Sequence, residues 1–392
     1  MFVMEGRGDL SMSKGKCFLT GMVIYVFIFL AGCGIEDGTA SLESNGVVDS
    51  DGFPVVAVDG GVYFFGDYVY YFDEKTETAA LLCNKPNCKH PPMPGGVCNA
   101  FLHAAGETYI YEGNIYVPVL EDEGYVLYRV RPDGSGFDPF LTLAQTNEEG
   151  LSHLGSCGSN GYYYFALTAF VTELGQLKED EVFDIYRVEM KENAQPEFLC
   201  TMSIERGGLF FMESSVNGVW VYVYYDDVES KIYFLEEGSQ TLQQLFADQI
   251  FFEFFNETAC YYGTKEGEFY KYENGEKSVV IEKEEKLENS TSELVYDGKI
   301  YISTKEAIEI YTEDGEFINT LSYGTVGAEW DLNDPEHRFQ RLLVGVTDGG
   351  LYLFYNEWWE GGDQCIYYMP LEEALSGNGE AWQEALSGFM YP

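Results

Sequence analysis

Basic side chains are scarce in this 392-residue sequence. Lysine and arginine together number 22 against 66 aspartates and glutamates, which gives a formal net charge of −44 at pH 7. A surface with this excess of carboxylates repels phosphate backbones and anionic lipid headgroups. We therefore expect no nucleic-acid partner, whereas cationic ligands, metal ions or simple solubility are compatible with the charge.

Recognisable catalytic motifs are also missing. The four histidines do not form a metalloprotease helix motif, and the sequence contains no G-x-S-x-G turn, phosphate-binding loop or dinucleotide fingerprint. Carboxylate pairs are so frequent in a chain this acidic that they do not identify a glycosidase. The motifs therefore give no indication of catalysis.

No apolar run is long enough to remain as a membrane span, which needs about 20 residues. The apolar segment 18–31 follows Lys14 and Lys16 and ends in Leu30-Ala31-Gly32-Cys33. This order is typical of a secretory signal peptide, which we predict at residues 1–32. The tetrapeptide resembles the lipobox of bacterial lipoproteins, which implies that Cys33 is lipidated and becomes the new N-terminus. An ordinary secreted protein with an unmodified cysteine is the alternative.

A lipid on Cys33 would anchor the protein to a membrane without a helix, because each buried methylene contributes about 0.8 kcal/mol. The location expected from this signal is extracytoplasmic, on the outer face of the cytoplasmic membrane. The segment after the cleavage point, residues 33–52, is rich in Gly, Ser, Asp and Glu and is predicted to be a flexible tether. No second linker follows, so residues 53–392 are expected to form one domain.

Aromatic residues make up 16% of the chain and recur in a pattern that repeats about every 40 to 55 residues. Each unit opens with a polar or glycine turn, such as Asn160-Gly161 or Asp297-Gly298, followed by an aromatic strand, and a second hairpin completes it. Four strands per unit predict an all-β fold, a β-propeller of seven four-stranded blades. A sandwich of two sheets is the rival architecture, but it would not need the same unit repeated. The seven units are 53–100, 101–150, 151–206, 207–248, 249–290, 291–338 and 339–392.

Three cysteines and a histidine lie close together after the first unit. Cys83, Cys88, His90 and Cys98 provide the ligand types of a tetrahedral Cys₃His zinc site, although the spacing is not the usual two-residue knuckle. An exported chain often meets an oxidising environment, so a disulfide between two of these cysteines is the competing hypothesis. Either structural zinc or a disulfide would staple a long loop. A closed four-ligand shell leaves no position for catalysis.

The segment Leu82-Cys83-x-Lys85-Pro86-x-Cys88-x-His90, followed by Cys98-Asn99-Ala100, resembles a signature of uncharacterised β-propeller lipoproteins from clostridial-type Gram-positive bacteria. The broader resemblance is to TolB-like and quinoprotein-like propellers. It implies a fold and supplies no activity or functional residues.

These observations predict a lipid-anchored, non-catalytic binding or scaffolding protein. Loops gathered at one mouth of the propeller channel would recognise an unknown protein, peptide or glycan. The alternative is an extracellular hydrolase or lyase that acts on glycan or peptide, with its site at the same mouth.

Overall fold

The computed structural model describes most of the predicted propeller. The predicted signal peptide, Cys33 and most of the predicted tether lie outside the described residues. Among the described residues no helix is long and apolar enough to cross a membrane. The described residues are 46–48, 55–66, 68–90, 98–102, 106–122, 124–145, 151–169, 180–205, 208–225, 229–250, 252–256, 258–264, 266–282, 284, 287, 290–324, 326, 339–357 and 364–387.

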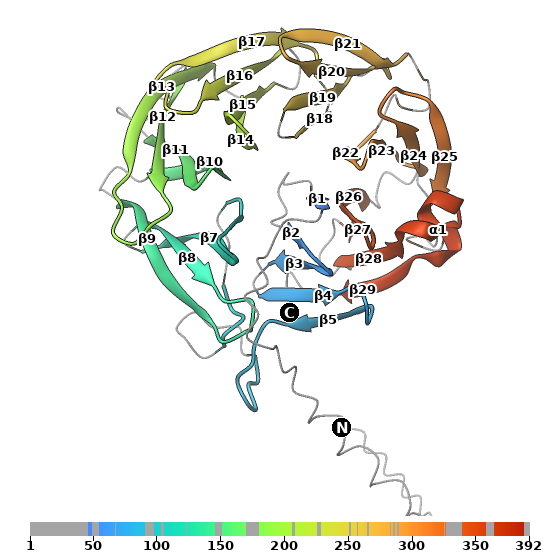
Figure 1. Cartoon of the computed structure of the whole chain (residues 1–392), viewed down its shortest axis with the longest axis horizontal. Coiled ribbons are helices and arrows are strands. Elements are labelled where there is room, and N and C mark those ends of the chain that lie inside the picture. The colour runs from blue at the N-terminus through green and yellow to red at the C-terminus, as the bar shows by residue number, and fades with distance from the viewer. Residues whose placement is uncertain are drawn as a thin grey trace, which may run out of the picture. The chain divides into compact units, whose positions relative to one another are not determined.

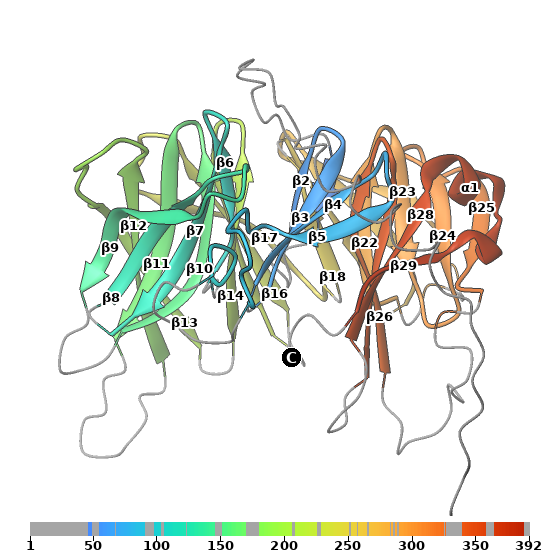
Figure 2. The same ribbon diagram turned by 90° about the horizontal axis from the view of Figure 1, so that it is seen from below.

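The described strands form seven antiparallel sheets, which confirms the predicted seven-bladed β-propeller. Figure 1 shows the sheets arranged in a ring, and Figure 2 shows the same ring from the side. Consecutive strands pair within each blade, from the first strand at the centre to the fourth at the rim. Blade 1 contains Val55–Val58 (β2), Gly61–Phe65 (β3), Val69–Asp73 (β4) and Thr78–Leu81 (β5). Blade 2 contains Tyr109–Tyr111 (β6), Asn114–Glu121 (β7), Gly124–Val130 (β8) and Phe137–Gln145 (β9). Blade 3 contains Leu151–Ser159 (β10), Tyr162–Ala169 (β11), Asp180–Glu189 (β12) and Glu197–Glu205 (β13).

The next three blades repeat the same order. Blade 4 contains Leu209–Ser215 (β14), Gly218–Tyr224 (β15), Ser230–Glu236 (β16) and Leu242–Asp248 (β17). Blade 5 contains Phe252–Phe255 (β18), Ala259–Gly263 (β19), Phe269–Glu273 (β20) and Glu276–Ile281 (β21). Blade 6 contains Ser292–Tyr296 (β22), Lys299–Ser303 (β23), Ala307–Thr312 (β24) and Phe317–Ser322 (β25).

Blade 7 differs because it has a fifth strand from the other end of the chain. Its own strands are Phe339–Thr347 (β26), Gly350–Glu357 (β27), Gln364–Pro370 (β28) and Gln383–Ser387 (β29), and Leu371–Ser376 forms the short helix α1. Gly46–Val48 (β1) pairs with β26 on the inner edge of the blade (Figure 1). The sequence analysis assigned these three residues to the tether and did not anticipate the strand.

The tight turns adopt the backbone conformation that their sequence predicts. Asn160-Gly161 has φ of +49° and +77°, and Asp297-Gly298 has φ of +47° and +67°. Two successive positive φ angles twist the chain in the sense that joins neighbouring antiparallel strands, and Asn, Asp and Gly tolerate them best. These turns join the first and second strands of blades 3 and 6 and set the register of those hairpins.

The core consists of apolar layers between neighbouring blades. Between blades 4 and 5, for example, Trp220 and Tyr222 pack with Cys260 and Tyr262. Both faces of the second strand of a blade are covered by neighbouring blades, so strands such as β3, β15 and β19 are buried along nearly their whole length instead of alternating. Tyrosine and phenylalanine bury a large area per side chain, which explains how 16% aromatic residues fill a ring of thin sheets.

Candidate metal centre and ligand groove

Cys83, Cys88, His90 and Cys98 converge in the connection between blades 1 and 2. One ligand atom from each residue lies within 4.8 Å of the others, and Nδ1 of His90 is 3.2 Å from Sγ of Cys98. Cys98 is buried and the other three are half-buried. The structure therefore brings together all four residues that the sequence analysis singled out as zinc ligands.

Backbone contacts hold the chain around this cluster, in a segment we call the strap (residues 82–90 and 98–102). The backbone N–H of Asn84 donates to the carbonyl of Gly134 at 3.0 Å, and the side-chain amide of Asn99 donates to the same oxygen at 3.1 Å. Gly134 belongs to the turn between β8 and β9. The strap after blade 1 is thus fastened to blade 2.

An aromatic wall lies behind the cluster. Tyr68 packs edge-to-face on Phe101 with ring centroids 5.2 Å apart, and its hydroxyl donates to the backbone carbonyl of His90 at 2.6 Å. Cys98 and Ala100 are buried against the same tyrosine. This packing places His90 beside the thiols, in a backbone conformation with φ of +46° that non-glycine residues rarely adopt.

The electrostatic environment differs between the thiols. Partial burial opposes ionisation of Cys83, but backbone N–H groups of Lys85 and Asn99 and the thiols of Cys88 and Cys98 donate to its sulfur, so its pKa is lowered. Burial raises the pKa of Cys98 to about 11, and the thiols of Cys88 and Cys83 add to this, although the backbone N–H of Ala100 acts in the opposite direction. The surroundings therefore favour a thiolate more at Cys83 than at Cys98.

Cys157 of β10 and Cys260 of β19 lie in a different environment, inside the packed blades. Cys157 and Cys260 are 2% and 0% exposed, and burial raises the pKa of both thiols well above the ordinary value. They pack as small apolar side chains. His103 and His337 lie outside the described residues.

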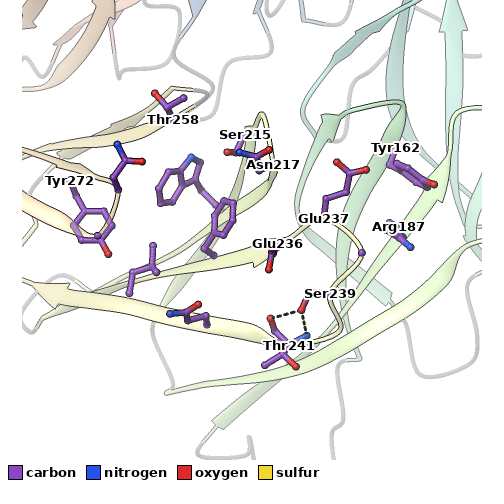
Figure 3. Close-up of a pocket in the computed structure, with 17 residues that line it drawn as sticks. Tyr162, Arg187, Ser215, Asn217, Glu236, Glu237, Ser239, Thr241, Thr258 and Tyr272 are labelled. Carbon is purple, nitrogen blue, oxygen red and sulfur yellow. Dashed lines mark hydrogen bonds between the residues drawn. The ribbon is translucent and has the colours of Figure 1, made fainter.

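A groove of about 1030 Å³ runs across the end of blade 4 and reaches blades 3 and 5 (Figure 3). Sequence reasoning did not find it, because its residues come from three blades and meet only when the ring is formed. Its lining combines aromatic rings with amide, hydroxyl and carboxylate groups: Tyr162, Arg187, Ser215, Asn217, Trp220, Phe234, Glu236, Glu237, Gly238, Ser239, Thr241, Gln243, Leu245, Thr258, Tyr272, Asn274 and Gly275.

Contacts between neighbouring groups hold the groove in shape. Figure 3 shows Tyr162 and Arg187 on one side, Tyr272 on the other, and Glu236 and Glu237 between them. The guanidinium of Arg187 lies 4.7 Å from the centre of the Tyr162 ring and pairs with Glu197, outside the groove, at 2.9 Å. The positive charge of Arg187 is thereby already paired, and the lining residues named above include two carboxylates, Glu236 and Glu237, against this one cation.

The inner wall and the blade junctions are also fixed. Trp220 packs edge-to-face on Phe234 with centroids 5.1 Å apart, and its indole N–H donates to the carbonyl of Asn256 in blade 5 at 3.2 Å. Asn160 of blade 3 donates to a carboxylate oxygen of Glu237 in blade 4 at 2.9 Å. Such cross-blade bonds preorganise the groove before any ligand binds.

Comparison with known proteins supports the fold. No protein-family model and no curated protein matches the chain. It is similar to the acylaminoacyl peptidase of Pyrococcus horikoshii, at 11% identity and a TM-score of 0.51, over 85% of this chain and 50% of that one. A prolyl endopeptidase structure gives 10% identity and a TM-score of 0.49, over 89% of this chain and 50% of that one. The chain spans about half the length of both. At such identities the similarity concerns the propeller fold alone.

Proposed function

We propose that this protein is a lipid-anchored, extracytoplasmic binding protein whose groove at the end of blade 4 takes a neutral or amino-bearing glycan. The groove itself carries the proposal: about 1030 Å³ of preformed space, lined by rings and by planar polar groups, is of the size and kind that small-molecule sites have. The lipobox-like tetrapeptide ending in Cys33 supports the anchored location.

The chemistry of the lining favours a sugar. The flat faces of sugar rings carry C–H groups that pack on aromatic rings, and Tyr162 and Tyr272 flank the groove on two sides. Hydroxyl groups of a sugar both donate and accept, and the amides of Asn217 and Gln243 can do the same. Glu236 and Glu237 accept only and carry negative charge, so they favour hydroxyl or ammonium donors over carboxylated or sulfated glycans.

The matched pair Gln243→Ala and Gln244→Ala tests this site. Both residues are exposed on β17, but only Gln243 lines the groove, because successive strand residues point to opposite faces. The full lipidated chain in detergent would be assayed against immobilised neutral, amino-bearing and acidic oligosaccharides. We expect binding to the first two classes, weakened about 2- to 10-fold by Gln243→Ala and unchanged by Gln244→Ala.

The same assay separates the other ligands and the enzymatic alternative. Binding to a peptide panel with the same Gln243 dependence would replace the glycan assignment by a peptide one. Release of shortened oligosaccharide or peptide during incubation would favour the hydrolase or lyase alternative. Equal loss of glycan binding in both variants, or no binding of any glycan, would remove the groove as the glycan site.

A further inference from the structure

We propose that Cys83, Cys88, His90 and Cys98 bind one zinc ion, and that this ion clamps blade 1 to blade 2. The four ligand atoms lie within 4.8 Å of one another, although Cys83 and Cys98 are fifteen positions apart in the sequence. Three sulfurs and an imidazole nitrogen are a donor set that tetrahedral zinc prefers. The proposal does not depend on the groove, which is built from blades 3, 4 and 5.

The geometry is close to what zinc needs. With Zn–S bonds of about 2.3 Å and tetrahedral angles, ligand sulfurs stand about 3.8 Å apart. Because the ligand atoms lie within 4.8 Å of one another, a contraction of the order of 1 Å at most closes the cluster around an ion. Nδ1 of His90, which is already 3.2 Å from the sulfur of Cys98, faces the thiols.

A disulfide accounts for fewer of the observations. It would join two of the three sulfurs and leave the third, with His90, in the same half-buried cluster without a role. Backbone N–H groups also point at the sulfurs: Ala100 N–H lies 3.4 Å from Cys98 Sγ, and Lys85 and Asn99 donate to Cys83. Thiolates that ligate a metal are stabilised by such outer donors, as the ligands of metal sites generally are.

Zinc binding exchanges the protons of the three thiols for the metal ion. Zn²⁺ forms three Zn–S bonds and one Zn–N bond, the three thiols release their protons to solvent, and the imidazole binds in its neutral form. No electron is transferred. Four protein ligands fill the tetrahedral shell, so the ion has no open position and acts structurally.

The clamp acts on a defined junction. Cys83 and Cys98 are adjacent in sequence to Asn84 and Asn99, and both asparagines bond to the Gly134 carbonyl in blade 2. An ion that fixes Cys83 relative to Cys98 therefore fixes both asparagines on the same oxygen. Metal removal is expected to loosen the strap while the hairpins of blades 3 to 7 keep their pairing.

Metal analysis of the full chain, purified without chelators, tests the proposal. The control variant is Cys200→Ser, because Cys200 is a half-buried cysteine on β13 of blade 3 and not part of the strap. We expect about one zinc per chain in the wild type and in this control. In Cys88→Ser we expect less than a tenth of that amount. Chelator should lower the thermal unfolding midpoint of the wild type and of Cys200→Ser, and added zinc should restore it.

A measurement on the wild type keeps the test independent of variant folding. Cobalt exchanged into the chelator-treated chain should give the intense visible absorption of a tetrahedral thiolate site. Absence of bound zinc together with absence of this spectrum would overturn the proposal. A disulfide between any two of Cys83, Cys88 and Cys98, found by mass spectrometry of the unreduced chain, would also overturn it.

Discussion

The hydroxyl of Tyr352 donates to a carboxylate oxygen of Glu74 at 2.7 Å, across 278 residues of sequence. Tyr352 is on β27 in the last blade and is fully buried, whereas Glu74 follows β4 in the first blade. Thr347 of the last blade donates to the same oxygen. This contact joins the first blade to the last and is one of the bonds that close the ring.

Replacement of Glu74 by alanine is expected to destabilise the ring closure. The variant leaves the buried hydroxyl of Tyr352 without its acceptor, which costs about 1 to 3 kcal/mol of unfolding free energy. Urea unfolding followed by tyrosine fluorescence measures the change. Glu74→Gln keeps an acceptor oxygen, so it should lose less unfolding free energy than Glu74→Ala. Glu192→Ala, on the exposed surface, should change the unfolding free energy by less than about 0.5 kcal/mol. Equal losses in Glu74→Ala and Glu192→Ala would contradict the assignment.

Alkaline pH is expected to destabilise the fold through its buried tyrosines. Burial raises the pKa of Tyr323 to about 12, although the Ser303 hydroxyl and the Arg341 guanidinium act in the opposite direction. The pKa of tyrosine in an unfolded chain is about 10. Above that pH the unfolded state therefore binds fewer protons than the folded state. The stabilisation by Tyr323 is therefore complete below about pH 10 and is lost as pH rises towards about 12.

Unfolding free energies measured between about pH 8 and 12 check this effect. In Tyr323→Phe the unfolding free energy should fall less steeply with pH. The difference in slope corresponds to at most one bound proton, or about 1.4 kcal/mol per pH unit. An unchanged slope in the variant would show that Tyr323 does not hold its proton in the folded state.

Gly134 allows the strap to approach blade 2. Its φ is +71°, and a β-carbon there would lie 3.2 Å from the backbone nitrogens of Cys83 and Asn84. Gly298, with φ of +67°, has nothing within 4 Å of the same position. Both alanine variants pay about 1 to 2 kcal/mol for the left-handed backbone, and Gly134→Ala should lose about 1 kcal/mol more in chemical denaturation because the strap must shift. An equal loss of stability in the two variants would show that the strap can move away from residue 134 without a measurable cost in free energy.

Lipidation at Cys33 is a prediction of the sequence alone. Cells fed a labelled fatty acid should incorporate label into the wild type and into Cys17→Ala, whose cysteine lies in the predicted signal peptide, but not into Cys33→Ala. In detergent phase partition the lipidated forms should enter the detergent phase, because two acyl chains bury many methylenes. Label on Cys33→Ala would exclude this residue as the site.

The repeat was readable from the sequence because each blade is a local structure. Two hairpins in succession need only turn residues and aromatic strands, and both are visible within one unit, as at Asn160-Gly161. The outermost strand of blade 7, β29, follows the short helix α1 and completes the same four-strand order. The inner strand β1 was missed, because three residues carry too little pattern to be told from a tether.

Of the two candidate sites, one was visible in the sequence and the other was not. Cys83, Cys88, His90 and Cys98 were found because four ligand-type residues lie within sixteen positions. The groove was not found, since Tyr162, Gln243 and Tyr272 lie in three different blades and bear no common motif.

The sequence by itself determined the seven-unit all-β class, the turn conformations and the identity of the four ligand-type residues, because these depend on interactions between residues near in the chain. Only the tertiary structure decided which blade faces meet, that Glu74 contacts Tyr352, and that blades 3, 4 and 5 share a groove. The physical reason is that ring closure and blade packing are long-range contacts, whose partners are set by the geometry of the whole ring and leave no local trace.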